Sequence, residues 1–425
     1  MDYIIENARL LDPATGRDEM GAIHVQDGLI AAVSADPTSL KTKGERIDAG
    51  GLCLAPGLID MRVKTGEPGD EYKETLATAS KAALSGGVTS FVVMPDTQPV
   101  IDGVALIRYI EDRARDTAKA KIYPAGGLTV GLKGEAMAEI GLMSEAGAVF
   151  FTNGDKPVSN ASILKRTMSY AASRNATIMS RPDETNLTGS GVMNAGTLAS
   201  RLGLSGMPAE AEWIGAARDL TLAEATGCRL IVDQASTPRT LELIAAAKSR
   251  GANVFTTIAA YSLYFNEADV DDYLTYCKVN PPFRDLETRD TMIAALKAGE
   301  IDAVVSAHDP QPPEEKRLPF SEAAFGAAGL ETTLSALLTL VQNGALTLLE
   351  ALAPVTNRPA DILSLPQGRL GEGTPADLIL FDPDKPWYCE REDLLSRSLN
   401  SPFDGKHLQG RVMRTFIDGV LVASR

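Results

Sequence analysis

Histidine is scarce in this sequence, and segments that would direct a chain into a membrane or out of the cell are missing. The 425 residues include three histidines, His24, His308 and His407, so few imidazoles are available for a metal or acid–base site. No apolar run approaches the roughly 18 residues that a membrane-spanning helix needs. The first residues lack the basic end and hydrophobic core of a signal peptide. We therefore expect a globular protein of the cytoplasm that has no membrane partner.

Cysteines are also few, and positive charge is in deficit. The four cysteines (Cys53, Cys228, Cys277 and Cys389) show no paired spacing, which favours a reducing compartment and a role as buried apolar fillers. The formal net charge is −15. Because nucleic acids and anionic membranes attract basic surfaces, this balance argues against either as a partner.

The two ends of the chain share one pattern. Residues 1–54 and 365–425 alternate short apolar runs with turn signals, among them Asp27-Gly28 and Asp418-Gly419. This alternation is typical of β-hairpins. We expect the two segments to form one small β-sandwich domain.

Residues 55–364 follow a different pattern, in which apolar runs alternate with amphipathic stretches. This alternation predicts an α/β fold with parallel strands, and eight such units indicate a TIM-type (β/α)8 barrel, with its site at the carboxyl ends of the strands. Residues 72–84 are expected to form the first helix, ending at Gly86-Gly87. The eight expected strands are 57–63, 88–95, 121–125, 148–152, 176–180, 229–233, 253–258 and 302–306.

The first strand–helix unit carries a recognisable motif. Residues 60–69 read DMRVKTGEPG, and YKET and MPDTQP follow; GVMNAG, KVNPPFR and FGAAGLETTL occur further along. These segments resemble the dihydroorotases, a branch of the cyclic amidohydrolases, whose pattern is D-x-H-x-H-x-R-E-P-G, then Y-K-E-T and M-P-N-T-x-P. The resemblance spans nearly the whole chain and implies zinc-dependent hydrolysis of a cyclic amide.

The positions that the resemblance assigns to metal and catalysis are altered. The two histidines of H-x-H are Arg62 and Lys64, whose charged groups have no lone pair for a metal. Ala307 replaces the catalytic aspartate and can carry no proton. We therefore expect the zinc site to be lost and no cofactor to be bound. The remaining positions of the degenerate site are Asn153 (or Gly154), Arg181 and Gln234.

The positions that would bind substrate are altered as well. The arginine that would clamp the substrate carboxylate is Gly66, and Asp96 replaces an asparagine and would repel an anion. Gln311 replaces a histidine that faces the substrate. Asn280 is retained.

Arg62, Lys64 and Arg181 leave two interpretations open. They fill the emptied site and pair with Asp60, Asp183 or Glu184, or they form an anion-binding pocket. The first interpretation is favoured.

Two functions follow from the resemblance. The favoured one is a catalytically inactive dihydroorotase-like protein of pyrimidine biosynthesis, a homodimer that acts as a structural partner of aspartate transcarbamoylase. The alternative is an active dihydroorotase or related cyclic amidase with a rearranged site. That site would use Asp155, His308 and Asp309, although Asp155 would reach it only through a shifted turn and the Asp309 side chain need not face the barrel axis.

Overall fold

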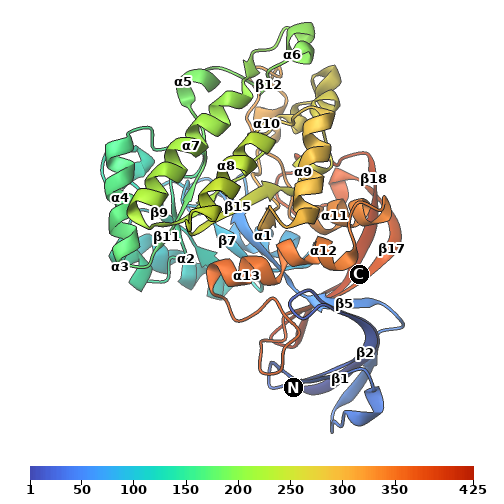
Figure 1. Cartoon of the computed structure of the whole chain (residues 1–425). Coiled ribbons are helices and arrows are strands. Elements are labelled where there is room, and N and C mark those ends of the chain that lie inside the picture. The colour runs from blue at the N-terminus through green and yellow to red at the C-terminus, as the bar shows by residue number, and fades with distance from the viewer.

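The two ends of the chain meet in one sheet. The computed structural model describes residues 1–425 apart from the side chain of Asp271. The sheet has the order β19-β18-β17-β5-β1-β2-β3, with β4 beside β1, and in Figure 1 its N-terminal strands lie below the helices. Its strands are β1 (Asp2–Asp12), β2 (Arg17–Gln26), β3 (Leu29–Ser34), β4 (Glu45–Asp48), β5 (Cys53–Pro56), β17 (Leu378–Cys389), β18 (Lys406–Ile417) and β19 (Val420–Ser424).

Tight turns join the outer hairpins of this sheet, as the sequence predicts. Asp27 and Gly28 connect β2 to β3 with φ of 51° and 84°, and Asp418 and Gly419 connect β18 to β19 with φ of 44° and 74°. Positive φ at both central residues matches the twist of a two-residue hairpin. The Tyr3 hydroxyl donates to the Gly419 carbonyl at 2.5 Å, which ties the two ends of the chain together.

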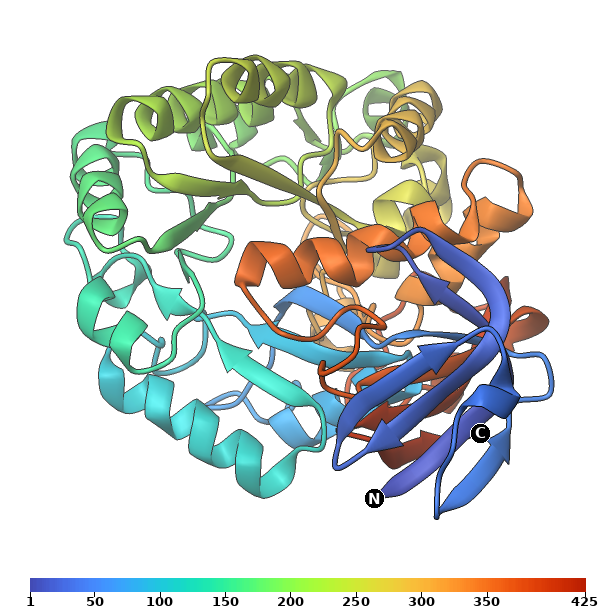
Figure 2. The same cartoon turned by 60° about the horizontal axis from the view of Figure 1, so that its bottom comes forward.

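Parallel strands form the second part of the α/β fold, inside a ring of helices (Figure 2). They run in the orders β6-β7-β8 and β9-β10-β11-β14-β15-β16. A parallel bridge joins Val63, the last residue of β6, to His308, which follows β16. The bounds are β6 (Leu58–Val63), β7 (Val88–Val93), β8 (Lys121–Pro124), β9 (Gly126–Gly127), β10 (Phe151–Thr152), β11 (Thr177–Ser180), β14 (Arg229–Val232), β15 (Val254–Ala259) and β16 (Ala303–Val305). Each of the eight predicted strands overlaps one of these. However, β9 was not predicted, and β10 is much shorter than predicted.

Helices cover the outer side of the parallel strands. The first, α1 (Leu76–Ser85), begins four residues later than predicted, because the Thr75 side chain accepts from Thr78 N and caps the helix there. Of the described helices, none combines the length and apolar character needed to span a bilayer. The others of six residues or more are α2 (Val104–Thr117), α3 (Ile140–Glu145), α4 (Ala161–Ser173), α6 (Thr197–Leu202), α7 (Ala209–Thr226), α8 (Pro238–Ser249), α9 (Leu286–Ala298), α11 (Thr333–Gln342) and α13 (Asn357–Leu363).

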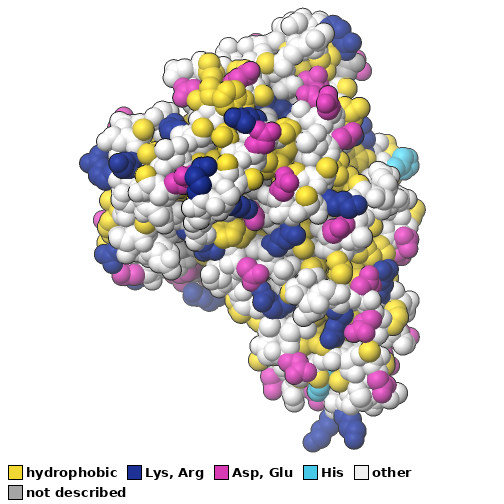
Figure 3. All heavy atoms as spheres, in the orientation of Figure 1, with side chains coloured by type: hydrophobic (Ala, Val, Ile, Leu, Met, Phe, Trp, Pro, Cys, Tyr) yellow, Lys and Arg dark blue, Asp and Glu magenta, His cyan; other side chains and the backbone are white. Residues whose placement is uncertain are grey.

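The strand interiors explain where a site can form. Every residue of β6 and β7 is buried, as expected for parallel strands covered on both faces. Polar side chains are therefore accommodated where the strands end. On the outer face shown in Figure 3, acidic and basic side chains are interspersed with apolar ones.

Candidate functional site

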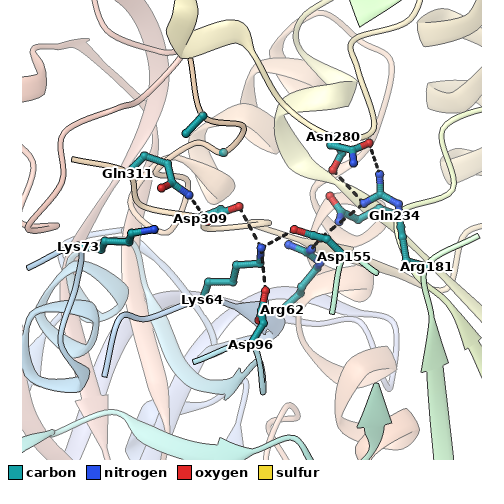
Figure 4. Close-up of polar contacts among 12 residues, drawn as sticks. Arg62, Lys64, Lys73, Asp96, Asp155, Arg181, Gln234, Asn280, Asp309 and Gln311 are labelled. Atoms are coloured by element: carbon teal, nitrogen blue, oxygen red, sulfur yellow. Dashed lines mark hydrogen bonds and ion pairs between the residues drawn. The ribbon is translucent and has the colours of Figure 1, made fainter. Parts of the chain in front are cut away.

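The end of β6 supplies two cations to the interior of the strand ring. Arg62 and Lys64 are two residues apart, so their side chains leave the strand on the same side. Arg62 is 2% exposed. Its Nε donates to Asp233 Oδ2 at 2.8 Å, and its Nη2 donates to Asp155. The guanidinium is thus held between carboxylates that follow two other strands, of which Asp155 is labelled in Figure 4.

Lys64 stands at the centre of a cluster of carboxylates. Its Nζ lies 2.9 Å from Asp96 and 3.2 Å from Asp309 and also contacts Asp155. Burial alone would lower the pKa of Lys64, but these three carboxylates raise it well above its ordinary value. The side chain is therefore an ammonium, and it offers no lone pair.

Arg181, at the end of β11, extends the cluster. Its guanidinium donates to the backbone oxygen of Asn280 at 2.9 Å and to the side-chain oxygen at 2.7 Å. The side-chain oxygen of Gln234 faces the two cations. It accepts hydrogen bonds from Arg181 Nη1 at 3.0 Å and from Arg62 Nε at 2.8 Å. Gln234 thus links two guanidinium groups that would otherwise face each other.

Two carboxylates of the cluster have opposite pKa shifts. Burial opposes ionisation of Asp155, but the charges of Lys64, Arg62 and Arg181 hold its pKa well below the ordinary range. Burial raises the pKa of Asp309, against the opposing charge of Lys64. Since pairs of acids with diverging pKa values mark acid–base sites, Asp309 is the candidate for proton transfer.

The prediction that the three cations pair with Asp60, Asp183 or Glu184 is wrong. Asp60 instead accepts from backbone nitrogens, Arg62 N at 3.0 Å and Ser306 N at 3.2 Å. Asp183 binds the Thr188 hydroxyl, and Glu184 caps a short helix, α5 (Thr185–Thr188). The partners are Asp96, Asp155, Asp233 and Asp309.

Two of these acids were misjudged from sequence and one was missed. Asp155 reaches the cluster because Gly154 adopts φ +63°, which turns the chain back after β10. Asp96 was expected to repel a substrate, but it binds Lys64. Asp233 is 1% exposed; its place at the end of a predicted strand was the available signal.

His308 and Asp309 do not form an acid–base pair. His308 is fully buried; its Nε2 lies 3.4 Å from Glu74 and its Nδ1 accepts from Gly329 N at 3.2 Å. Asp309 faces Lys64, contrary to expectation. The two side chains thus have separate partners, and the preceding Ala307 has φ +49°.

Most of the remaining positions of the former site make contacts within the protein. A Cβ on Gly66 would collide with the Asp70 carbonyl oxygen, so this backbone excludes a clamping side chain. Gln311 donates to Asp309 at 2.8 Å. Asn153 accepts from Thr129 N at 3.1 Å, and its Nδ2 has no hydrogen-bond partner among the described residues. The retained Asn280 is engaged by Arg181.

The side chains at the strand ends do not fit a zinc ion. Arg62 and Lys64 occupy the positions of the H-x-H ligands, and the three carboxylates that could bind a cation are directed at the Lys64 ammonium. Within the described part of the chain, no three His, Cys, Asp or Glu side chains are arranged to hold a metal.

A cavity of about 160 Å³ opens beside Lys64 and Asp309. Lys73 lies on its wall and extends toward Asp309 and Gln311 (Figure 4). Its Nζ is 4.0 Å from Glu315 and 5.9 Å from the centre of the Tyr72 ring, so it is only weakly held. Lys73 belongs to the YKET motif, and its position in the sequence does not predict that it lines the cavity.

The fold places the chain in a known class of enzymes. It superposes on the L-hydantoinase (dihydropyrimidinase) of Arthrobacter aurescens with a TM-score of 0.90, covering 100% of this chain and 96% of the other at 28% identity. The α/β core and the terminal sheet are thus those of an amidohydrolase.

Sequence comparison is more specific. Residues 51–240 match the Dihydro-orotase-like family model. The chain is 42% identical to the dihydroorotase of Syntrophotalea carbinolica (99% of this chain, 98% of the other) and 38% identical to that of Pelobacter propionicus (100% of both). The chain belongs to the dihydroorotase family.

These relatives contradict the favoured function. The expectation was a catalytically inactive partner of aspartate transcarbamoylase, yet relatives 36–42% identical over the whole length are named dihydroorotase. That expectation is corrected: the relatives favour its alternative, an active dihydroorotase or related cyclic amidase with a rearranged site.

The charge cluster predicts a specific stability effect. Asp155→Asn removes a carboxylate shared by Arg62 and Lys64 and should cost about 3 kcal/mol of unfolding free energy, as for broken buried pairs. Because the pKa of Asp155 is depressed in the folded state, its contribution is present above the unfolded value of about 3.9 and is lost as pH falls through the folded pKa. Urea unfolding between pH 3 and 7 measures both effects.

The control for this experiment is Asp290→Asn, which removes an exposed partner of Arg289 and should cost less than about 1 kcal/mol. Equal losses in the two variants, or a difference that widens as the solution is acidified, would contradict the assigned role of Asp155.

Proposed function

We propose that this chain makes or breaks the C–N bond of an anionic cyclic amide of the dihydroorotate type, at the cavity beside Lys64. One observation carries the proposal. An ammonium and a carboxyl of raised pKa, Lys64 and Asp309, lie 3.2 Å apart on the wall of a cavity that holds a second cation, Lys73. The full-length relatives named dihydroorotase support the same reaction class.

These groups account for the proton transfers of amide hydrolysis. The Asp309 carboxylate takes a proton from water as the water oxygen adds to the carbonyl carbon. The Lys64 ammonium stabilises the negative charge that forms on the carbonyl oxygen. Asp309 then returns the proton to the ring nitrogen as the C–N bond breaks; ring closure follows the reverse path. A raised pKa suits a group that both accepts and donates a proton.

Lys73 is proposed to bind the substrate carboxylate. Gly66 cannot carry a clamping side chain, and Arg62 and Arg181 are already bound to neighbours. Lys73 is the weakly held cation on the cavity wall, and an ammonium suits a carboxylate as a point charge.

We propose that the enzyme works without a resident metal. The reason is the donor set, in which a protonated lysine takes the carboxylates that would bind a cation. Elemental analysis of purified protein should give well under one zinc per chain, and chelator treatment should leave the melting temperature unchanged. About one zinc per chain, lost in Asp155→Ala or His308→Ala, would contradict this.

The activity test separates proton transfer from binding. Asp309→Asn should lower kcat by about 10²–10⁴-fold. Lys73→Met should mainly raise KM, because it removes a contact made equally in the ground and transition states. Lys133→Met changes an exposed lysine and should have no effect on either constant. Interconversion of dihydroorotate and carbamoyl aspartate, followed in both directions, gives these values.

The pH profile supplies a second readout. Hydrolysis should decline as pH falls through a pKa above the ordinary aspartate value, since the base form of Asp309 is then lost. No turnover by the unmodified protein, or full turnover by Asp309→Asn, would overturn the proposal.

We also propose an architecture and a cellular setting for the chain. We propose that the parallel strands close into a TIM-type barrel spanning 55–364. Two features support closure: the consecutive strands β8 and β9 belong to different sheets, and a bridge joins Val63 to His308. A composite domain of 1–54 and 365–425, a cytoplasmic location and the absence of a nucleic-acid or membrane partner are proposed with it. A homodimer is expected, and sedimentation at micromolar concentration tests it.

A further inference from the structure

A second cavity, of about 430 Å³, lies where α1 packs beside β18 and β19. It is larger than the cavity beside Lys64 and shares no lining residue with it. Volumes of this order are typical of sites for small organic ligands. Its walls therefore indicate what kind of ligand it suits.

The interior of this cavity is largely apolar. Leu84 on α1, Val412 on β18 and Val422 on β19 line it. Leu84 and Val412 are buried and Val422 is half-buried. Burying an apolar ligand group against these side chains would remove apolar surface from water, which is favourable. An apolar body is favoured by this surface.

The charged side chains that line the cavity are all cationic. Lys81, Lys119, Arg414 and Arg425 line the cavity, and no Asp or Glu side chain does. This excess of positive charge stands out in a chain with a net charge of −15. Clustered cations of this kind suit carboxylate or phosphate groups.

Three of these cations are free to bind a ligand. Lys81, Lys119 and Arg414 form no side-chain ion pair within the described residues, whereas Arg425 donates to the Ser85 hydroxyl at 2.6 Å and lies 3.8 Å from Glu331. Arg425 therefore closes one side of the cavity, and the other three supply unpaired charge at its rim.

We propose that this cavity is a binding site for a small amphipathic anion. The apolar body lies against Leu84, Val412 and Val422, and the carboxylate or phosphate head binds Lys81, Lys119 and Arg414. The site is separate from the cavity beside Lys64, so the inference does not depend on the proposed reaction.

Calorimetric titration of the full chain with octanoate, octyl phosphate and octanol tests the proposal. Both anions should bind one per chain at least 10-fold more tightly than the alcohol, and their affinity should fall as salt is added. The anion that binds more tightly identifies the head group. Because no substrate is present, failure here is distinct from failure of the catalytic proposal.

Two variants make the assignment specific. Lys81→Met with Arg414→Met should weaken anion binding at least 10-fold, and Val422→Phe should do so by filling the cavity. Lys165→Met, on α4, is the matched control and should bind normally; melting temperatures check folding of each protein. Equal affinity for octanol and octanoate, no binding at millimolar concentration, or unchanged binding in both variants would overturn the site.

Discussion

The ion pairs around Lys64 are the interaction on which the strand ends depend. Three carboxylates from different segments converge on one ammonium, and Arg62 shares Asp155 with it while binding Asp233. Removing charges from water is costly unless each is matched. Each cation therefore specifies where its acidic partners must lie, and the loops after several strands are fixed by this matching.

The backbone conformations around the cluster follow from the same requirement. Gly154 and Ala307 have positive φ; Asp155 follows Gly154 directly, and Asp309 lies two residues after Ala307. Asp60 fixes the opposite side by accepting from Arg62 N and Ser306 N, and burial raises its pKa to about 6. The turns after β10 and β16 thus direct the carboxylates of Asp155 and Asp309 toward the cations. The residues at the family's motif positions, Asn153 and Ala307, do not take this role.

Sequence reasoning located the strands and the cations but not their partners. The apolar runs marked all eight strand positions, and the motif marked Arg62, Lys64 and Arg181 at three strand ends. Asp233 was missed, and the pairing of the other acids with the cations was not predicted. A spacing within one segment does not report contacts across 91 or 171 residues, the separations from Lys64 to Asp155 and from Arg62 to Asp233. The directions of the His308 and Asp309 side chains follow a turn in which Ala307 has positive φ. An alanine in the sequence does not predict such a backbone conformation. The predicted start of the first helix at residue 72 is wrong because the Thr75 cap begins α1 at Leu76.

A lysine in a carboxylate cluster also limits what chemistry can be expected. An ammonium can stabilise an oxyanion, but it does not lower the pKa of a bound water as a metal does. Water must then be activated by a carboxylate of raised pKa, and in this cluster burial raises the pKa of Asp309 while Asp155 remains ionised. Because Asp96, Asp155 and Asp233 already pair with Arg62 and Lys64, Asp309 need not stay charged to balance them. The proton-transfer group and the charge-balancing group are therefore different residues, which is what allows one of them to change protonation during turnover.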